Sequence, residues 1–346
     1  MNDYSFLLPE LAPSVPADPS RFPIGIVGAG SITRYGHMPA YKKAGFNVRA
    51  IASRTAAHAR NYKNEYNIPL MFDDPLDLAR SDEIAVLDMT FPYDEDRLPV
   101  IKSAAEHGKA ILIQKPLAHS LETANEIIAI GKANGVNIAV NQNARWSPHY
   151  RMAHLLKREG FFGELYFLEH RMMNNQAGQS WFAGPDKWYS TSDRFQVLEY
   201  GIHHIDLLRF WAGCEPAVVG SRRVTRSDLP VRGDIAYGMT LDFGGAIGSL
   251  VEDNSAALST TPTSTFRVAG TRGEVTGESM GPSPHITLYA GSESQRFELK
   301  EHNWFPDGFI GTMGELLLSV EERRESTISA GDNVHSLRIA LSAYTT

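Results

Sequence analysis

The chain has 346 residues, 42% of them hydrophobic, and a formal net charge of -7 from 33 basic and 40 acidic side chains. This length suits about two domains, and the acidic balance argues against a nucleic-acid partner, because phosphate binding requires clustered Lys and Arg. The one cysteine, Cys214, excludes an internal disulfide framework and a cysteine-based zinc site, and we expect it to be buried and inert.

Residues 1–21 form a Pro-rich segment, which predicts an extended arm before the first strand. The segment lacks the basic start and the long apolar run of a signal peptide. No stretch of the chain approaches the ~20 apolar residues that a membrane helix requires. With a single cysteine, these features predict a cytoplasmic protein that has no membrane partner.

From residue 22 onward, predicted strands and helices alternate. The strands are expected at 24–27, 47–52, 84–91, 110–114 and 136–140, and the helices at 31–44, 55–66, 95–107 and 121–133. The strands are almost continuously apolar, which is typical of strands buried on both faces. The alternation predicts a doubly wound parallel sheet, an α/β domain over residues 22–145.

Beyond about residue 145 the pattern changes. Helices are expected at 148–157 and 198–211, strands and turns over 217–299, and helices again at 308–322 and 333–344. Glycine-rich hairpin signals occur at 243–245 and 270–273. Residues 146–346 therefore predict a second domain, of the α+β class, which we expect to bind the substrate. Its sheet is large and mostly antiparallel, and its last helices are candidates to pack back on the first domain.

A glycine-rich turn joins the first predicted strand to the first predicted helix. Gly28 permits the tight turn, and Gly30 lets the backbone approach a pyrophosphate that the helix start, with Ser31 and Ile32, would hold. Thr33 stands where a third small residue is usual, so the dinucleotide fingerprint is incomplete. Its place at the first βα junction still predicts a Rossmann domain that binds a nicotinamide dinucleotide.

The end of the second predicted strand selects the form of the cofactor. An Asp or Glu there would bind the adenosine ribose hydroxyls and favour NAD, but this chain has Ser53 and Arg54. A hydroxyl and a guanidinium can accept the 2′-phosphate of NADP. Arg54 could equally be a solvated residue at a helix start, with NAD bound through other contacts. We expect NAD(P), with NADP slightly favoured.

Three segments follow strands or lie in the second domain where a site is expected. They are Gln114-Lys115-Pro116, the stretch 141–148, and the stretch 199–208. Together, in this order and at these separations, they resemble the glucose–fructose oxidoreductase / inositol dehydrogenase / MocA family. The resemblance covers most of the chain, from residue 25 to about residue 206 by motif. It implies an oxidoreductase with a Rossmann domain.

The family motifs can be carried over residue by residue. In the family a strand-end Glu-Lys-Pro places its lysine at the nicotinamide and the substrate, which matches Lys115. A later Asp, Gly, His and Asp match Glu199, Gly201, His203 and Asp206.

Two departures from these motifs matter. Gln114 replaces a Glu, which removes a carboxylate beside Lys115 and should lower the pKa of that lysine. Glu199 replaces an Asp, which keeps the charge but lengthens the side chain.

The chemistry of alcohol oxidation supports roles for these residues. A positioned base must take the hydroxyl proton. Glu199 and His203 are four apart and share a face of a helix, so the carboxylate can orient the imidazole. We predict His203 as the acid/base and Glu199 as its orienter or a substrate ligand. Lys115 would be the electrostatic partner and an alternate base, and the roles of Lys115 and His203 can be reversed.

The remaining site predictions fall into two groups. Further cofactor contacts are expected from Thr90, Pro92, Gln114, Lys115, Asn143 and Trp146. Substrate contacts are expected from Lys115, Trp181, Arg194, Glu199, His203 and His204. Amides and aromatic rings suit a sugar, so we add Asn174, Asn175, Gln176, Gln179, Trp188 and Tyr189, although any polar loop contains such residues.

No metal site is predicted. His203 and His204 are adjacent, so on a helix they point about 100° apart, and no further His or Cys is suitably placed. Asp206 is expected to be structural, paired with Arg209 or a backbone amide.

These observations predict an NAD(P)-dependent oxidoreductase of a sugar, inositol or related polyol. It would convert an aldose to a lactone or a ring alcohol to a ketone, and the reverse reduction is also open. A non-catalytic NAD(P)-binding sensor on the same fold is the alternative. Lys115 and His203 speak against a sensor, and the changes at Gln114 and Glu199 speak weakly for it. The family resemblance also implies a homodimer or homotetramer.

Overall fold

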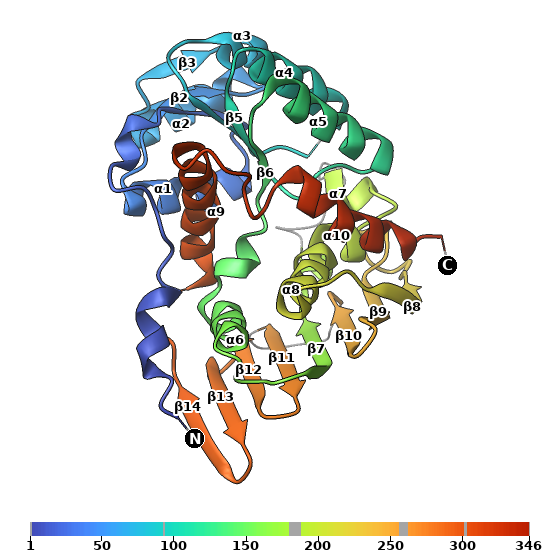
Figure 1. The fold of residues 1–346 in the computed structure, drawn as a ribbon. Helices are drawn as coiled ribbons and strands as arrows, with labels where there is room; N and C mark the ends of the chain where they lie inside the picture. The colour runs from blue at the N-terminus through green and yellow to red at the C-terminus, as the bar shows by residue number, and fades with distance from the viewer. Residues whose placement is uncertain (1, 93, 180–187, 256–261, 301–302, 346) are drawn as a thin grey trace. The chain divides into compact units, whose positions relative to one another are not determined.

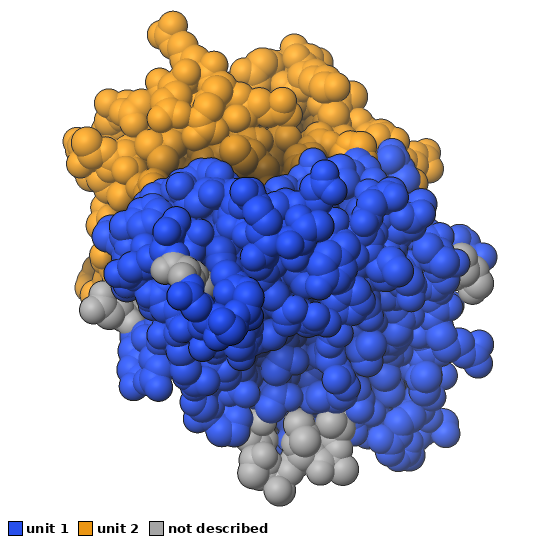
Figure 2. Space-filling view, turned by 60° about the horizontal axis from the view of Figure 1, so that its bottom comes forward, with its two compact units in different colours: residues 1–12, 147–302, 336–346 blue, residues 13–146, 303–335 orange. Residues whose placement is uncertain are grey.

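The computed structural model of the chain describes residues 2–92, 94–179, 188–255, 262–300 and 303–345. It divides into two compact units, which Figure 2 colours separately. We call residues 13–146 with 303–335 the parallel-sheet unit, and residues 1–12, 147–302 and 336–346 the mixed-sheet unit. Among the described helices, none combines the length and the apolar character needed to cross a bilayer.

The parallel-sheet unit is built on six parallel strands in the order β3-β2-β1-β4-β5-β6. Their bounds are β1 Ile24–Val27, β2 Val48–Ala52, β3 Leu70–Phe72, β4 Val86–Met89, β5 Ala110–Ile113 and β6 Ile138–Val140. Every residue of β1, β4 and β5 is buried, because helices cover both faces of the sheet. The predicted doubly wound fold is confirmed. The strand order reverses beside β1, where such folds bind ligands.

Helices form a layer on each face of this sheet. They are α1 (Met38–Ala44), α2 (Ala56–Tyr66), α3 (Pro75–Arg80), α4 (Asp94–Glu106), α5 (Leu121–Asn134) and α9 (Trp304–Glu321). α4 contacts both α3 and α5 in one layer, while α1 contacts α9 in the other (Figure 1). α9 thus returns from late in the chain to cover the sheet, with Phe309 buried against His37.

The mixed-sheet unit contains eight strands in the order β14-β13-β12-β11-β7-β10-β9-β8. Their bounds are β7 Leu165–Met173, β8 Ala217–Val224, β9 Ala236–Asp242, β10 Ile247–Asp253, β11 Thr263–Gly270, β12 Glu274–Met280, β13 His285–Ala290 and β14 Glu293–Phe297. Only the β7–β10 pair among these is parallel. This confirms the predicted large, mostly antiparallel sheet, including hairpin turns at 243–245 and 270–273.

Two helices cover one face of the eight-stranded sheet. α6 (Pro148–Arg158) contacts β12, and α8 (Ile202–Ala212) contacts β7 and β10 (Figure 1). Along β10 the side chains alternate, with Leu250 fully buried and Ile247 53% exposed. One face of the sheet is therefore core and the other faces outward. A last helix, α10 (Ala330–Ser342), closes the chain.

Several expectations from the sequence need correction. β3, α3 and β7 were not predicted. The N-terminal segment is not simply extended, because it contains the short 3-10 helices η1 (Ser5–Leu11) and η2 (Pro19–Arg21), and η1 buries Leu7 and Leu11. Cys214 is exposed rather than buried, since it follows Gly213 in the turn that ends α8.

Candidate active site

The glycine loop after β1 has the backbone that a phosphate cradle needs. Gly28 has a φ of +117°, and a Cβ there would lie 2.4 Å from the Thr90 hydroxyl, so no other residue fits. A Cβ at Gly30 would meet no atom within 4 Å, so the space beside the loop is open. This geometry fits the close approach of a pyrophosphate.

Thr33 occupies the position where the dinucleotide fingerprint usually has its third small residue, and its contacts give it a structural role there. It begins a π-helical turn, η3 (Thr33–His37), and is fully buried. Its Oγ1 lies 3.2 Å from the Gly28 carbonyl oxygen and 2.8 Å from Thr90 Oγ1. Thr90 in turn donates toward the Val27 carbonyl, at 3.1 Å. The two hydroxyls tie the helix start to the ends of β1 and β4.

A third hydroxyl reaches the same loop from α2. The Tyr62 hydroxyl donates to the Gly30 carbonyl at 2.7 Å. Arg34 lies over the Tyr62 ring, 5.0 Å from its centre, and its Nη1 is 2.8 Å from Glu65 Oε1. Because side-chain hydroxyls bind the carbonyls of the loop, its shape is fixed from inside the unit. The sequence analysis did not identify Tyr62, because one tyrosine in a helix gives no such signal.

The cofactor-selecting position lies at the end of β2. Ser53 is buried, whereas the Arg54 side chain is 73% exposed. Arg54 Nη1 is 3.5 Å from Asp96 Oδ2 on α4, a loose ion pair between exposed groups. The guanidinium therefore lies near the surface at the end of β2. This position suits both a ligand of the 2′-phosphate of NADP and a solvated residue at a helix start.

The strand-end motif of β5 is held by a residue that the sequence analysis missed. Arg97 of α4 is 1% exposed and donates to the carbonyls of Phe91, Gln114 and Pro116 at 2.5, 3.1 and 2.9 Å. These carbonyls follow β4 and flank Lys115 on both sides. Lys115 itself is half-buried. An arginine among acidic residues at a helix start is typical of a surface cation, so nothing in the sequence marked it.

Gln114 and its neighbours in the motif have distinct surroundings. Gln114 is buried, and its Oε1 has no hydrogen-bond partner among the described residues. A buried amide oxygen without a partner is a candidate acceptor for a bound group, which fits the predicted cofactor contact. Pro92, two residues after Thr90, is half-buried at the end of β4.

Asn143 and Trp146 lie in the short helix η4 (Asn143–Trp146), which packs against α9. Both are buried, and Asn143 Oδ1 accepts a hydrogen bond from Trp304 Nε1 at 2.7 Å. Their contacts within the parallel-sheet unit are therefore to the late helix α9. Their predicted contact with cofactor stays a prediction.

Glu199 and His203 lie in the mixed-sheet unit, on one continuous helical segment. Glu199 belongs to a π-helical turn, η6 (Gln196–Gly201), and His203 to the first turn of α8. Both side chains are buried. π-Helical turns are rare and occur frequently at functional sites. Lys115 belongs to the parallel-sheet unit.

A buried carboxylate, Asp234, fixes the start of this segment. Its two oxygens accept the backbone amides of Phe195 and Val197, each at 2.9 Å, and Oδ1 also accepts the Tyr344 hydroxyl at 2.9 Å. A carboxylate is stabilised at the start of a helix, because the first backbone N–H groups have no partner within the helix. Burial and the adjacent Asp234 raise the pKa of Tyr344, so its hydroxyl remains a donor.

Asp206 has the structural role that was predicted. Its Oδ1 lies 3.5 Å from Arg209 Nη1 and accepts the Ser336 hydroxyl at 3.0 Å. Arg209 also pairs with Glu215, at 2.5 Å. These contacts join α8 to α10.

The expectation that no other histidine lies near His204 was wrong. The His170 ring of β7 stacks on the His204 ring with centres 3.6 Å apart and planes 12° apart. His204 Nδ1 is 2.5 Å from Glu252 Oε1, so the three residues form a compact buried group. A metal ion must lie close to the plane of each imidazole that binds it, and two stacked parallel rings do not offer this. The absence of a metal site stays a prediction.

The predicted substrate residues have varied surroundings. Trp181 lies outside the described residues, and of Tyr189 only its place in α7 (Trp188–Thr191), which begins with Trp188, is described. The Asn174 side chain accepts backbone amides of Asn175 and Gln176, in the loop that holds η5 (Gln176–Gly178) and Gln179. The Arg194 guanidinium lies 5.6 Å from the Tyr344 ring centre. Their roles toward substrate stay predictions.

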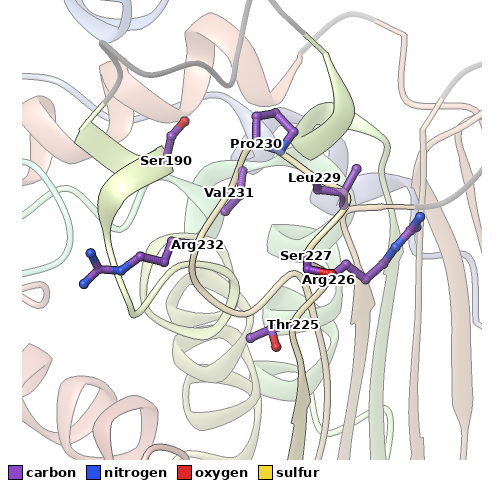
Figure 3. Close-up of a pocket in the computed structure, with 8 residues that line it drawn as sticks. All are labelled: Ser190, Thr225, Arg226, Ser227, Leu229, Pro230, Val231 and Arg232. Carbon is purple, nitrogen blue, oxygen red and sulfur yellow. The ribbon is translucent and has the colours of Figure 1, made fainter.

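The mixed-sheet unit also has a surface pocket of about 420 Å³. It is lined by Ser190, Thr225, Arg226, Ser227, Leu229, Pro230, Val231 and Arg232. Figure 3 shows the two guanidinium groups extending away from each other on opposite sides of it. Arg226 pairs with Asp228 and Arg232 with Asp193. The pocket thus gathers no polar group aimed inward that would mark a catalytic centre.

Known proteins resemble the chain in both halves. Residues 22–142 match an oxidoreductase family with an NAD-binding Rossmann fold, and residues 150–276 match the GFO/IDH/MocA C-terminal domain. An uncharacterized oxidoreductase of Bacillus subtilis, YrbE, is 23% identical over 92% of each chain. Inositol 2-dehydrogenase of Rhizobium meliloti is 22% identical over 91% of this chain and 94% of its own.

The fold also recurs among solved structures. An oxidoreductase from Agrobacterium radiobacter, crystallised with NAD+, L-tartaric acid and magnesium, superposes with a TM-score of 0.83 at 18% identity. The match covers 94% of this chain and 95% of that one. With matched Rossmann and C-terminal domains and the motifs at Lys115 and His203, the chain belongs to the GFO/IDH/MocA family of oxidoreductases.

Proposed function

We propose that the protein is an NAD(P)-dependent dehydrogenase of a sugar, inositol or related polyol. It would oxidise an aldose to a lactone or a ring alcohol to a ketone. The observation that carries the proposal is the buried placement of Glu199 and His203 on one helical segment, held from inside the unit. The likeness to inositol 2-dehydrogenase over nearly its full length supports the same substrate class.

The proposed chemistry removes a hydride and a proton from one alcohol group of the substrate. The loop of Gly28 and Gly30 would hold NAD(P), which would supply the hydride acceptor for the carbon that carries the hydroxyl. His203 takes the hydroxyl proton as the base, and Glu199 orients the imidazole or binds a neighbouring substrate hydroxyl. Lys115 donates a hydrogen bond to the reacting oxygen and stabilises the negative charge that develops there. Exchange of the roles of Lys115 and His203 would preserve the proton balance.

We also propose that Ser53 and Arg54 favour NADP over NAD. A guanidinium offers paired charged donors to a phosphate, and Arg54 is a largely exposed cation at the end of β2. The buried Ser53 hydroxyl would add one hydrogen bond.

The function is tested by turnover with a substrate panel. The pure protein is incubated with NAD+ or NADP+ and pentoses, hexoses, inositols and sugar acids, and reduced nicotinamide is followed by absorbance. We expect turnover with at least one polyol. Cofactor binding without turnover on any of them would instead favour a sensor.

Variants test the proposed residues. Lys115→Ala and His203→Ala should each lower kcat by about a hundredfold or more, with cofactor affinity largely intact. Lys132→Ala and His58→Ala, at exposed helix positions, are the matched controls. Near-normal turnover in both site variants would overturn the assignment.

A further inference from the structure

Glu252 is a charged residue at the centre of the mixed-sheet unit. It lies on β10 and is 1% exposed. A buried carboxylate is costly unless hydrogen bonds satisfy it. Its Oε1 accepts from His204 Nδ1 at 2.5 Å and from the Tyr237 hydroxyl at 2.9 Å, and its Oε2 accepts from Gln196 Nε2 at 2.9 Å. One carboxylate therefore collects three donors.

The donors bracket the two proposed catalytic positions. Gln196 opens η6 three residues before Glu199, and His204 follows His203 directly. Both ends of the catalytic segment are thus bonded to the same carboxylate on β10.

Tyr237 brings the third contact to the middle of the segment. A Cβ at Gly201 would lie 2.4 Å from the Tyr237 hydroxyl oxygen, so the hydroxyl fits only because residue 201 has no side chain. This close approach explains the motif glycine between Glu199 and His203. The same Tyr237 hydroxyl donates its hydrogen bond to Glu252.

The segment needs such support because η6 is π-helical. π-Helical turns are rare and usually occur singly within α-helices. Reversion to α-helical pairing would change the register by one residue, and so turn Glu199 by about 100° relative to α8. On this segment, the Asp234 carboxylate accepts backbone amides at the start of η6, before Glu199. Glu252 supplies the restraint on both sides of the catalytic pair.

The surroundings of His204 are matched to this arrangement. His170 stacks on its ring, and Tyr150, Ser264 and His170 hydrogen-bond one another behind it. Burial, and secondarily His204, lower the pKa of His170 well below its ordinary value, so His170 is a neutral platform. The rings and the carboxylate together leave His204 one orientation.

We infer that Glu252 is a positioning residue of the active site, whose buried carboxylate fixes the segment that carries Glu199 and His203. The inference rests on the proposed function for the roles of those two residues. Glu252 acts through Gln196, Tyr237 and His204 rather than on substrate.

Two substitutions separate the hydrogen bonding from the bulk of the side chain. Glu252→Gln keeps an acceptor for Tyr237 and His204, and Gln196 can turn its amide to accept, since its Oε1 has no partner among the described residues. Glu252→Leu removes both acceptor oxygens, and with them all three hydrogen bonds, at similar side-chain volume. We expect kcat to fall less than tenfold in the first variant and about a hundredfold in the second, because small displacements of catalytic groups cost that much. Cofactor affinity should not change.

The matched control is Leu288→Ala, a fully buried position on β13 of the same sheet, away from α8. It lowers stability without contacting the segment, so its kcat should stay near that of the unchanged protein. Equal kcat in Glu252→Leu and Leu288→Ala would overturn the inference.

Histidine NMR tests the inference without turnover. With labelled histidine, His203 and His204 are assigned from His203→Gln and His204→Gln. Both signals should move in Glu252→Leu and stay near their positions in Glu252→Gln, while the exposed His58 is unaffected. An unmoved His203 signal would contradict the positioning role even if no substrate is turned over. Conversely, moved signals with no turnover would sustain the role and reject the proposed function.

Should Glu252→Leu fail to fold, Tyr237→Phe serves in its place. It removes one donor from Glu252 and leaves the ring beside Gly201. We expect a loss of kcat of about fivefold to twentyfold and a smaller shift of the His203 signal. A Tyr237→Phe protein identical to the parent in both measurements would also overturn the inference.

Discussion

Single side chains fix the shape of the loop after β1, and one of them is our candidate for selecting the cofactor. The Thr33 and Thr90 hydroxyls are hydrogen-bonded to each other, and both lie within hydrogen-bond distance of the Gly28 carbonyl in the loop. The Arg54 side chain, by contrast, is 73% exposed, and its Nη1 lies 3.5 Å from Asp96 Oδ2. The first feature is structural and buried, and the second is exposed and suited to a ligand.

Arg54→Ala tests the assignment of the cofactor. We expect KM for NADP+ to rise about tenfold or more and KM for NAD+ to change little, because only NADP carries the 2′-phosphate. Initial rates with both cofactors measure this. Arg49→Ala on β2, which breaks an exposed pair with Glu83, is the control. An unchanged ratio of the two constants would remove Arg54 from cofactor selection.

His149 predicts a pH dependence of stability. It is buried on α6, and burial, followed by the charge of His285, lowers its pKa from 6.5 to about 4. The unfolded chain therefore binds more protons between these values, so the free energy of unfolding should fall as pH drops through this window. The loss is up to about 3 kcal/mol.

Urea unfolding at pH 7 and pH 5 checks this. His149→Gln should flatten the dependence on pH, whereas His58→Gln, at an exposed position, should leave it as it is. The same slope in the parent and His149→Gln would assign the effect to other groups.

At the scale of elements, loops at the ends of strands are held by side chains from helices. Arg97 reaches from α4 to carbonyls after β4 and β5, and Tyr62 reaches from α2 to the loop after β1. In the mixed-sheet unit the roles of strand and helix are exchanged. There Asp234, just before β9, and Glu252, on β10, bind groups of the helical segment. Site residues thus lie on backbone fixed by groups from a second element.

Arg97→Met should destabilise the parallel-sheet unit by about 3 kcal/mol, because buried carbonyls would lose their donors. It should also lower kcat, since Lys115 lies between two of those carbonyls. Arg97→Lys should not restore either property, because an ammonium cannot span three acceptors as a guanidinium does. Thermal unfolding and initial rates measure both.

Arg80→Met is the control for Arg97, since Arg80 is exposed on α3 beside Asp77. It should change stability by less than about 0.5 kcal/mol. Equal effects of Arg97→Met and Arg80→Met would contradict the proposed support of the loops.

Much of the fold could be predicted because its signals are local. Buried parallel strands are apolar throughout, and β1 matches its predicted bounds. β7 was missed because inward His170 and outward Glu169 and Arg171 disguise its alternation, and its burial depends on distant strands. Lys115 and His203 were found through short motifs, whereas Glu252 has no local motif, since its three donors meet only in the folded unit.

At the scale of the whole molecule, the outward face of the eight-stranded sheet bears on self-association. Ile247 and Val251 on β10 are 53% and 38% exposed, and neighbouring strands add charged residues. Exposed apolar groups among polar ones are typical of interaction surfaces. We propose that two copies associate through this face.

The double variant Ile247→Asp, Val251→Asp tests this proposal. Light scattering after gel filtration should find an oligomer for the parent and a monomer for the variant, because paired copies would bury unpaired charges. Tyr35→Asp, which adds a charge at an exposed position of the other unit, should leave the mass unchanged. A monomeric parent, or a variant of undiminished mass, would contradict the proposed interface.

The place of β7 in its sheet has a consequence for biosynthesis. Its two neighbours, β10 and β11, are both encoded far downstream, at residues 247–253 and 263–270. A ribosome must therefore release most of the chain before β7 can pair on either edge. Closing such long loops slows folding. Residues 196–204 emerge between β7 and its partners, so the hydrogen bonds from Gln196 and His204 to Glu252 can form only after β10 has followed.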